Sequence, residues 1–166
     1  MNAKGGVIMA VETTNISART HPTVAQAMYQ CVAETTVTTM MAQNFHWNVT
    51  GMAFGPLHEL FQDIYEDHFS AQDELAERIR SIGHTVDGRL SAMIDISKVT
   101  EDPDGSHKSD KEMIKALADA QKTLASTLSG ASDIAAANGD KLTEDLCVER
   151  GRAHDKFAWL LQSHIS

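Results

Sequence analysis

The feature that most constrains the fold is a long amphipathic segment between Pro56 and Gly83. Its apolar residues recur mostly at steps of three and four, which is the spacing of one helix face that packs on a core. These residues are Leu57, Leu60, Phe61, Ile64, Leu75, Ile79 and Ile82. Proline suits the first turn of a helix, where the N–H that it lacks has no partner, and glycine suits the C-terminal cap. We therefore predict one long helix between these two positions.

Four potential metal ligands lie on this segment and just before it. His46 and His58 flank a turn that contains glycine and proline, and Asp73 and Glu77 follow on the helix. Imidazole and carboxylate together are the ligand set of first-row transition metals. The two acidic residues are four apart, so both carboxylates can point at one ion. Each of these residues alone could belong to a solvated or packed surface, and it is their joint spacing that indicates a metal site.

The distance between His58 and Asp73 restricts how such a site can form. The two residues are fifteen positions apart, which is about 22 Å along a helix that rises 1.5 Å per residue. A metal holds its ligands at about 2 Å. Either the two residues serve different sites, or two copies of the chain meet antiparallel. In the second case a twofold pairing creates two equivalent sites at a subunit interface.

Three short motifs in this region resemble those of a known family. The runs NFHWNVTG, LHELF and DELAERI are similar to those of the Dps family, the miniferritins named as DNA-binding proteins from starved cells. The similarity extends from about Val24 to the KFAWLL run near the end of the chain. It implies an all-α, ferritin-like four-helix bundle with a short extra helix in the connection between helices two and three.

The resemblance also implies an assembly and a site. The assembly is a hollow dodecameric shell, and the ferroxidase site lies between twofold-related subunits. One subunit would contribute His46 and His58, and its partner would contribute Asp73 and Glu77. Gln62 departs from the family pattern, which usually has an acidic residue four positions after the second histidine. Asp63 is a poor substitute because one position turns a helical side chain by about 100°.

The substitution by Gln62 leaves the metal stoichiometry open. Its side chain can offer a neutral carbonyl oxygen or hold a water molecule. We expect a weaker second metal position than an acidic residue would give, so the sequence is compatible with one or two iron ions per site.

Length and composition favour one all-α domain. The chain has 166 residues, of which 42% are hydrophobic and three are proline. We divide it into a flexible tail, residues 1–20, and a bundle, residues 21–166. No apolar run is long enough to cross a membrane, and the N-terminus lacks a signal-peptide core. Cys31 and Cys147 lie in apolar helical contexts and are expected to be buried free thiols, which fits the cytoplasm.

Start and stop signals predict the remaining helices. A short helix is expected within the segment 84–100, where the run GRLSAMIDIS carries apolar residues. The first helix is predicted to start at Thr20–Pro22 and to end at about Asn44. The third is predicted to start at the capping box Ser109–Glu112 and to end at the stop signal Asn138–Gly139. The fourth is predicted to start at Leu142 or Thr143.

The charge of the chain bears on its partners. The formal net charge is −9, which argues against general affinity for DNA because such binding depends on neutralising phosphates. The family includes proteins that condense DNA through a basic N-terminal tail, whereas this tail is nearly neutral. We therefore expect weak DNA binding, with association with the nucleoid left open. An acidic chain instead favours attraction of cations.

Acidic residues gather where the fourth predicted helix begins. They are Asp140, Glu144, Asp145 and Glu149. Acids favour helix N-termini through the helix dipole, and this ordinary explanation suffices for the cluster. The resemblance offers another, because in the family this region lines pores that draw Fe(II) into the cavity. On that basis Asp140 and Asp145 are candidate pore carboxylates.

The function implied by the resemblance is that of a ferroxidase and iron store. Fe(II) would bind at the intersubunit site, be oxidised preferentially by hydrogen peroxide, and be stored as ferric oxide, which would protect the cell and its DNA. Two alternatives remain open at this point. One is a non-enzymatic shell that coats DNA. The other is a shell whose altered site binds zinc or another ion and oxidises iron slowly.

Overall fold

The computed structural model describes residues 23–101 and 108–165, and in these residues it contains helices and no strands. The helices are α1 (Val24–Asn48), α2 (Phe54–Ser81), α3 (Leu90–Ile96), α4 (Asp110–Ala137) and α5 (Lys141–Gln162). The tail predicted for residues 1–20 lies outside the described residues, so its boundary stays a prediction.

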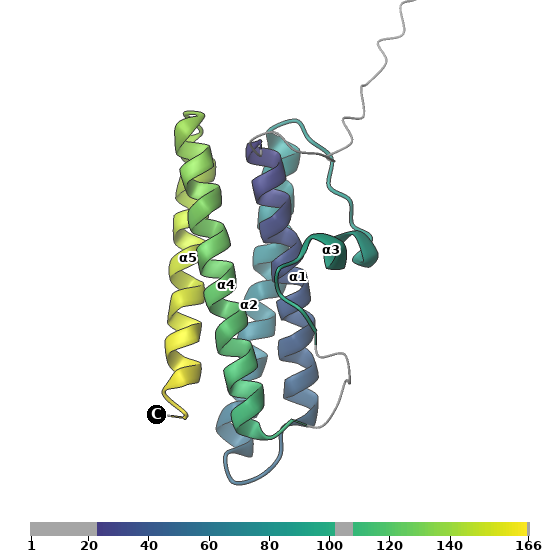
Figure 1. Ribbon diagram of the computed structural model, residues 1–166, viewed down its shortest axis with the longest axis vertical. Helices are drawn as coiled ribbons and strands as arrows, with labels where there is room; N and C mark the ends of the chain where they lie inside the picture. Colours follow the sequence, from purple (N-terminus) through teal and green to yellow (C-terminus); the bar gives the residue numbers. More distant parts are fainter. Residues whose placement is uncertain (1–22, 102–107, 166) are drawn as a thin grey trace, which may run out of the picture.

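The four long helices lie side by side as a bundle (Figure 1). Consecutive helices form two hairpins, α1 with α2 and α4 with α5, and α1 also packs along α4. The short helix α3 lies in the crossover between the hairpins and contacts α1 on the outside of the bundle. This confirms the predicted fold, a four-helix bundle with an extra helix between the second and third long helices.

The caps explain where the helices begin and end. The capping box predicted at Ser109 and Glu112 is present, and Thr23 forms a second one with Gln26. Gly83 and Gly139 follow α2 and α4 with φ values of 93° and 72°, a conformation that other residues rarely adopt. The predicted start at Thr20–Pro22 lies outside the described residues, within which α1 begins at Val24; the predicted end near Asn44 was wrong, because the helix continues to Asn48. The extension places His46 in the last turn of α1.

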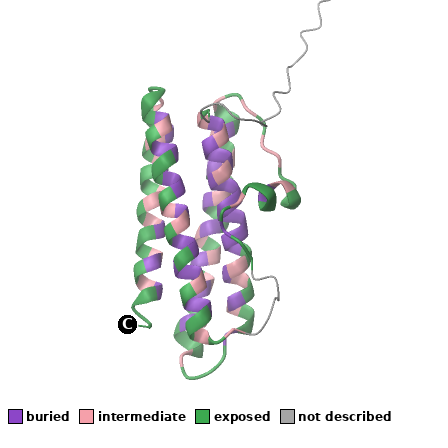
Figure 2. Cartoon of the chain, viewed as in Figure 1, coloured by how far each residue is buried: buried purple, intermediate pink, exposed green. Residues whose placement is uncertain are grey.

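The core runs along the inner faces of all four long helices (Figure 2). Helix α1 is buried over most of its circumference, including four threonines. Each of these hydroxyls donates to a backbone carbonyl four residues earlier at 2.7–2.8 Å, which satisfies it without a tertiary partner. The threonines are Thr35, Thr36, Thr38 and Thr39. Cys31 and Cys147 are buried free thiols, as predicted.

A chain of hydrogen bonds crosses the core between the hairpins. Arg150 on α5 donates to the Asp67 carboxylate on α2, and the ring Nδ1 of His68 lies 3.2 Å from the same carboxylate. On α4, the Gln121 amide contacts His68 Nε2 at 2.9 Å and His154 Nδ1 at 2.7 Å. Because a carboxylate only accepts, His68 carries its proton on Nδ1; Gln121 then donates to His68 and accepts from His154. Within the described residues His154 Nε2 has no partner.

The buried histidines of this hydrogen-bond network predict that the stability of the protein depends on pH. Burial lowers the pKa of both His68 and His154, so both stay neutral in the folded protein. The unfolded chain takes up these protons near pH 6.5. As pH falls below that value the unfolded state binds more protons, and the free energy of unfolding drops by up to about 1.4 kcal/mol per pH unit for each histidine.

Urea unfolding between pH 7.5 and 5.0, at fixed subunit concentration, measures this effect. The variant His154→Leu should show a shallower pH dependence, whereas His164→Leu, at an exposed position, should match the unaltered protein. Equal slopes for all three proteins would contradict the assignment of the neutral buried histidines.

Candidate metal centre

His46 and His58 are locked together by a reciprocal pair of hydrogen bonds. His46 Nδ1 lies 2.8 Å from the backbone carbonyl oxygen of His58, and His58 Nδ1 lies 2.9 Å from that of His46. A carbonyl oxygen only accepts, so each Nδ1 carries the hydrogen and donates it. Each Nε2 is then left with a free lone pair, which is the state of a histidine that ligates a metal.

Neighbouring rings and the connecting turn hold this pair in place. The two imidazoles stack with their centroids 3.7 Å apart. Phe54 stacks on His58 with ring centroids 4.9 Å apart, and Tyr65 and His46 form a T-shaped pair with centroids 5.3 Å apart. The turn between α1 and α2 contains Gly51 with a φ of 94°. The last turn of α1 and the second turn of α2 therefore present two oriented imidazoles from opposite sides of one short connection.

Asp73 and Glu77 lie on the same helix as His58 but far from it. Because α2 runs without interruption from Phe54 to Ser81, Asp73 is about 22 Å from His58 along the axis. Both carboxylates are exposed. Within the part of the chain that the structure describes, no three His, Cys, Asp or Glu side chains come together as a metal site. One subunit thus presents the four candidate ligands as two separate halves.

Gln62 lies one turn after His58 and is engaged by a residue that the sequence analysis did not single out. Its side-chain Nε2 donates to Glu66 Oε1 at 2.7 Å. The sequence feature that could have indicated this contact is the spacing of four residues between Gln62 and Glu66, which places both on one helix face. Asp63 is exposed.

The candidate pore residues occupy two different settings. Asp140 caps α5: its carboxylate accepts from the Thr143 backbone N–H at 3.1 Å and pairs with Arg78 of α2 at 2.7 Å. Burial alone would raise the pKa of Asp140, but the hydrogen bonds from Thr143 and the Arg78 charge hold it below its usual value. Asp140 therefore has a structural role, and its assignment to a pore stays a prediction.

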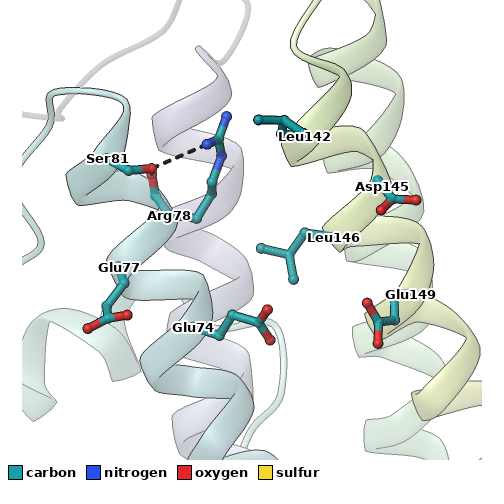
Figure 3. Close-up of a pocket in the computed structure, with 8 residues that line it drawn as sticks. All are labelled: Glu74, Glu77, Arg78, Ser81, Leu142, Asp145, Leu146 and Glu149. Carbon is teal, nitrogen blue, oxygen red and sulfur yellow. Dashed lines mark hydrogen bonds between the residues drawn. The ribbon is translucent and has the colours of Figure 1, made fainter.

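Asp145 borders a groove of about 400 Å³ between α2 and α5. Three further acidic residues, Glu74, Glu77 and Glu149, line the groove with it. Figure 3 shows that the Glu77 carboxylate is directed away from α5, whereas Glu74 reaches toward it. Glu77 is thus oriented toward the outer face of α2, as a ligand shared with another subunit would need.

Comparisons with known proteins first define the class. A family model described as a ferritin-like domain matches residues 25–166. The crystal structure of Dps from Staphylococcus aureus has a TM-score of 0.82 to this chain at 32% identity, covering 86% of this chain and 95% of that one. A Dps structure from Vibrio cholerae, described as a member of a broad superfamily of ferritin-like diiron-carboxylate proteins, has a TM-score of 0.81 at 26% identity, covering 86% and 89%.

Sequence relatives narrow the class to one family. The DNA protection during starvation protein of Helicobacter pylori is 33% identical over 81% of this chain and 92% of its own length. The protein of the same name from Brevibacillus brevis is 31% identical, over 86% and 94% respectively. The chain belongs to the Dps family of ferritin-like proteins. Among the described residues, none of the helices is apolar enough over a sufficient length to span a membrane.

Proposed function

We propose that the protein is a miniferritin that oxidises Fe(II) and stores the ferric product. The observation that carries the proposal is the interlocked pair His46 and His58, whose two Nε2 atoms are oriented and free. Membership in a ferritin-like family makes iron the expected metal. Zinc, which imidazole and carboxylate also bind, could compete at the same centre.

The proposed centre is completed by a second copy of the chain. Two α2 helices would pair antiparallel, so that the histidines of one subunit face the partner's Asp73 and the partner's Glu77 across a twofold axis. In an antiparallel pair, a residue four positions later on one helix lies opposite a residue four positions earlier on the other. With His58 opposite the partner's Asp73, Gln62 lies opposite the partner's Phe69.

The exposed apolar side chains support this pairing. Phe69 is 72% exposed in the single chain and borders two adjoining grooves, one of which also contains Asp73. Two further exposed apolar side chains, Met40 on α1 and Leu90 on α3, line one of these grooves with Phe69. Monomeric proteins rarely leave such a face uncovered. A second copy would cover it and would bring the two halves of the metal centre together.

In the proposed reaction the residues bind the substrate iron and stabilise its oxidised form. The imidazoles select a transition metal over Mg(II) or Ca(II), and the two carboxylates favour the higher charge of Fe(III). One hydrogen peroxide molecule takes one electron from each of two Fe(II) ions and yields two hydroxide ions. Removing both Fe(II) and hydrogen peroxide prevents the formation of hydroxyl radicals. This removal would protect DNA even if the protein does not bind it.

The remaining parts of the proposal follow from the family and the charge. Twelve subunits would enclose a cavity for ferric oxide, as the resemblance implies, with Asp140 and Asp145 as candidate pore residues. Binding to DNA would be weak because the net charge is −9. The two buried free thiols fit a cytoplasmic site of action. Because Gln62 removes one negative charge from the centre, a shell with slow ferroxidase activity is the second candidate.

Anaerobic addition of Fe(II), followed by hydrogen peroxide, tests the proposed function. The protein should bind Fe(II) before oxidant is added, and it should then consume about one peroxide for every two Fe(II) ions. A spin trap should report less hydroxyl radical than in the same mixture without protein. Absence of Fe(II) binding would contradict the proposal, and slow oxidation with normal binding would favour the second candidate.

The variant Phe69→Lys tests the proposed pairing. A charged side chain placed at a water-excluded twofold contact is expected to prevent pairing, because burying an unpaired charge is costly. Light scattering should show a smaller assembly, and Fe(II) binding should be lost with it. Phe69→Leu keeps an apolar side chain and should retain both properties. Full assembly of Phe69→Lys would place the interface elsewhere.

A further inference from the structure

We propose that Glu66 is a positioning residue that sets Gln62 to act as a neutral oxygen ligand of the metal centre. The inference rests on the proposed function and concerns the position where this chain lacks the family's acidic residue. The observation behind it is the hydrogen bond of 2.7 Å from Gln62 Nε2 to Glu66 Oε1.

The hydrogen bond fixes the orientation of the Gln62 side-chain amide. A carboxylate only accepts, so the NH₂ group must face Glu66, and the carbonyl oxygen lies on the other side of the amide. Gln62 is partly buried, and within the described residues its side chain makes one hydrogen bond, the one that it donates to Glu66. Glu66 follows Gln62 by four residues and His58 precedes it by four, so the amide lies between them on one helix face. The oxygen is thereby left available on the side away from Glu66.

Glu66 itself is too far along the helix to replace the missing ligand. It follows His58 by eight residues, which is about 12 Å along the axis. At this distance its direct electrostatic effect on the metal is weak, so we expect Glu66 to act mainly through the amide. A charged acceptor polarises the N–H bond and increases the partial negative charge on the carbonyl oxygen. Partners of this kind orient metal ligands and tune their basicity.

In the single chain the hydrogen bond between Gln62 and Glu66 is exposed, and the proposed pairing would cover it. Glu66 borders the apolar groove that contains Tyr65 and Phe69, which is the face that the second copy would cover. The proposed register places the partner's Phe69 opposite Gln62. Water would then be excluded from the hydrogen bond, and exclusion of water strengthens a bond to a charged group. The Gln62–Glu66 pair would supply an oriented neutral oxygen where Asp63 points the wrong way.

Equilibrium titration with Co(II) in the absence of peroxide measures how Glu66 affects the metal affinity, because Co(II) then binds without being oxidised. The variant Glu66→Ala should lower the apparent Co(II) affinity of the assembled protein by about 10-fold and should change the ligand-field absorption of bound Co(II). Glu66→Gln, which keeps an acceptor oxygen, should recover much of the affinity. Size-exclusion chromatography should show an unchanged assembly for both variants. Unchanged affinity and spectrum in Glu66→Ala would overturn the inference.

A double substitution tests whether Glu66 acts through Gln62. On a Gln62→Leu background, Glu66→Ala should have no further effect, since no amide remains to be oriented. A second 10-fold loss there would contradict the positioning role. The variant His58→Ala separates this inference from the proposed function. If His58→Ala abolishes Co(II) binding and Glu66→Ala changes nothing, only the inference fails; if His58→Ala also changes nothing, the proposed centre is wrong.

Discussion

Replacement of His58 by alanine is expected to lower the rate of peroxide-driven Fe(II) oxidation by on the order of 100-fold or more. The change removes one proposed Nε2 ligand, and it also removes the hydrogen bond that holds the ring against the His46 carbonyl. The appearance of ferric product after rapid mixing with peroxide measures the rate. His164→Ala, at an exposed position in the turn that follows α5, should be as fast as the unaltered protein.

Asp73→Ala is expected to cause a loss of similar size, although Asp73 is about 22 Å from His58 within one chain. The two variants should also bind less Fe(II) before oxidant is added. Equal rates for either variant and the unaltered protein would show that the substituted residue is not part of the centre. Loss in His58→Ala alone would instead support a site built only around the histidine pair.

Replacement of Gln121 by leucine is expected to be the most damaging single change to stability outside the apolar core. It leaves His68 Nε2 and His154 Nδ1 without the partners that they have at 2.9 and 2.7 Å. Each unsatisfied buried group costs about 1–3 kcal/mol, so the free energy of unfolding should fall by about 2–6 kcal/mol. Urea unfolding at neutral pH measures the difference.

The triple variant with leucine at His68, Gln121 and His154 provides the control for this prediction. Removing all partners together leaves fewer unsatisfied groups, and such replacements can be nearly neutral. The triple variant should therefore be more stable than Gln121→Leu alone. A further loss of stability in the triple variant would show that packing, rather than hydrogen bonding, determines the contribution of Gln121.

The sequence predicted the architecture well because local signals coincide with the boundaries of most helices. The capping box at Ser109, the glycines at positions 83 and 139, and the apolar period of α2 each have a direct structural counterpart. The end of α1 was placed one turn too early, because the polar residue Asn44 does not interrupt the helix, which continues to Asn48. Its threonines form hydrogen bonds to their own helix, so low intrinsic propensity did not mark a boundary.

The candidate site residues could be proposed from the sequence, but their local geometry could not. Spacing alone singled out His46 and His58, yet the reciprocal bonds between Nδ1 and carbonyl oxygen depend on how the turn at Gly51 folds back. The hydrogen bonds that link His68, Gln121 and His154 join three different helices. No periodicity within one segment reports such contacts, because they depend on how the two hairpins pack.

Co-expression of His58→Ala with Asp73→Ala subunits is the most direct measurement of the central claim, that the metal centre is shared between two subunits. In a mixed pair one centre carries both substitutions and the other carries neither. With random pairing about a quarter of all centres should be intact, and ferroxidase activity should return to about that fraction. Co-expression of His58→Ala with His46→Ala should restore nothing, since both changes affect the same half. If the first mixture also stays inactive while assembling normally, the centre is not shared and the account is wrong.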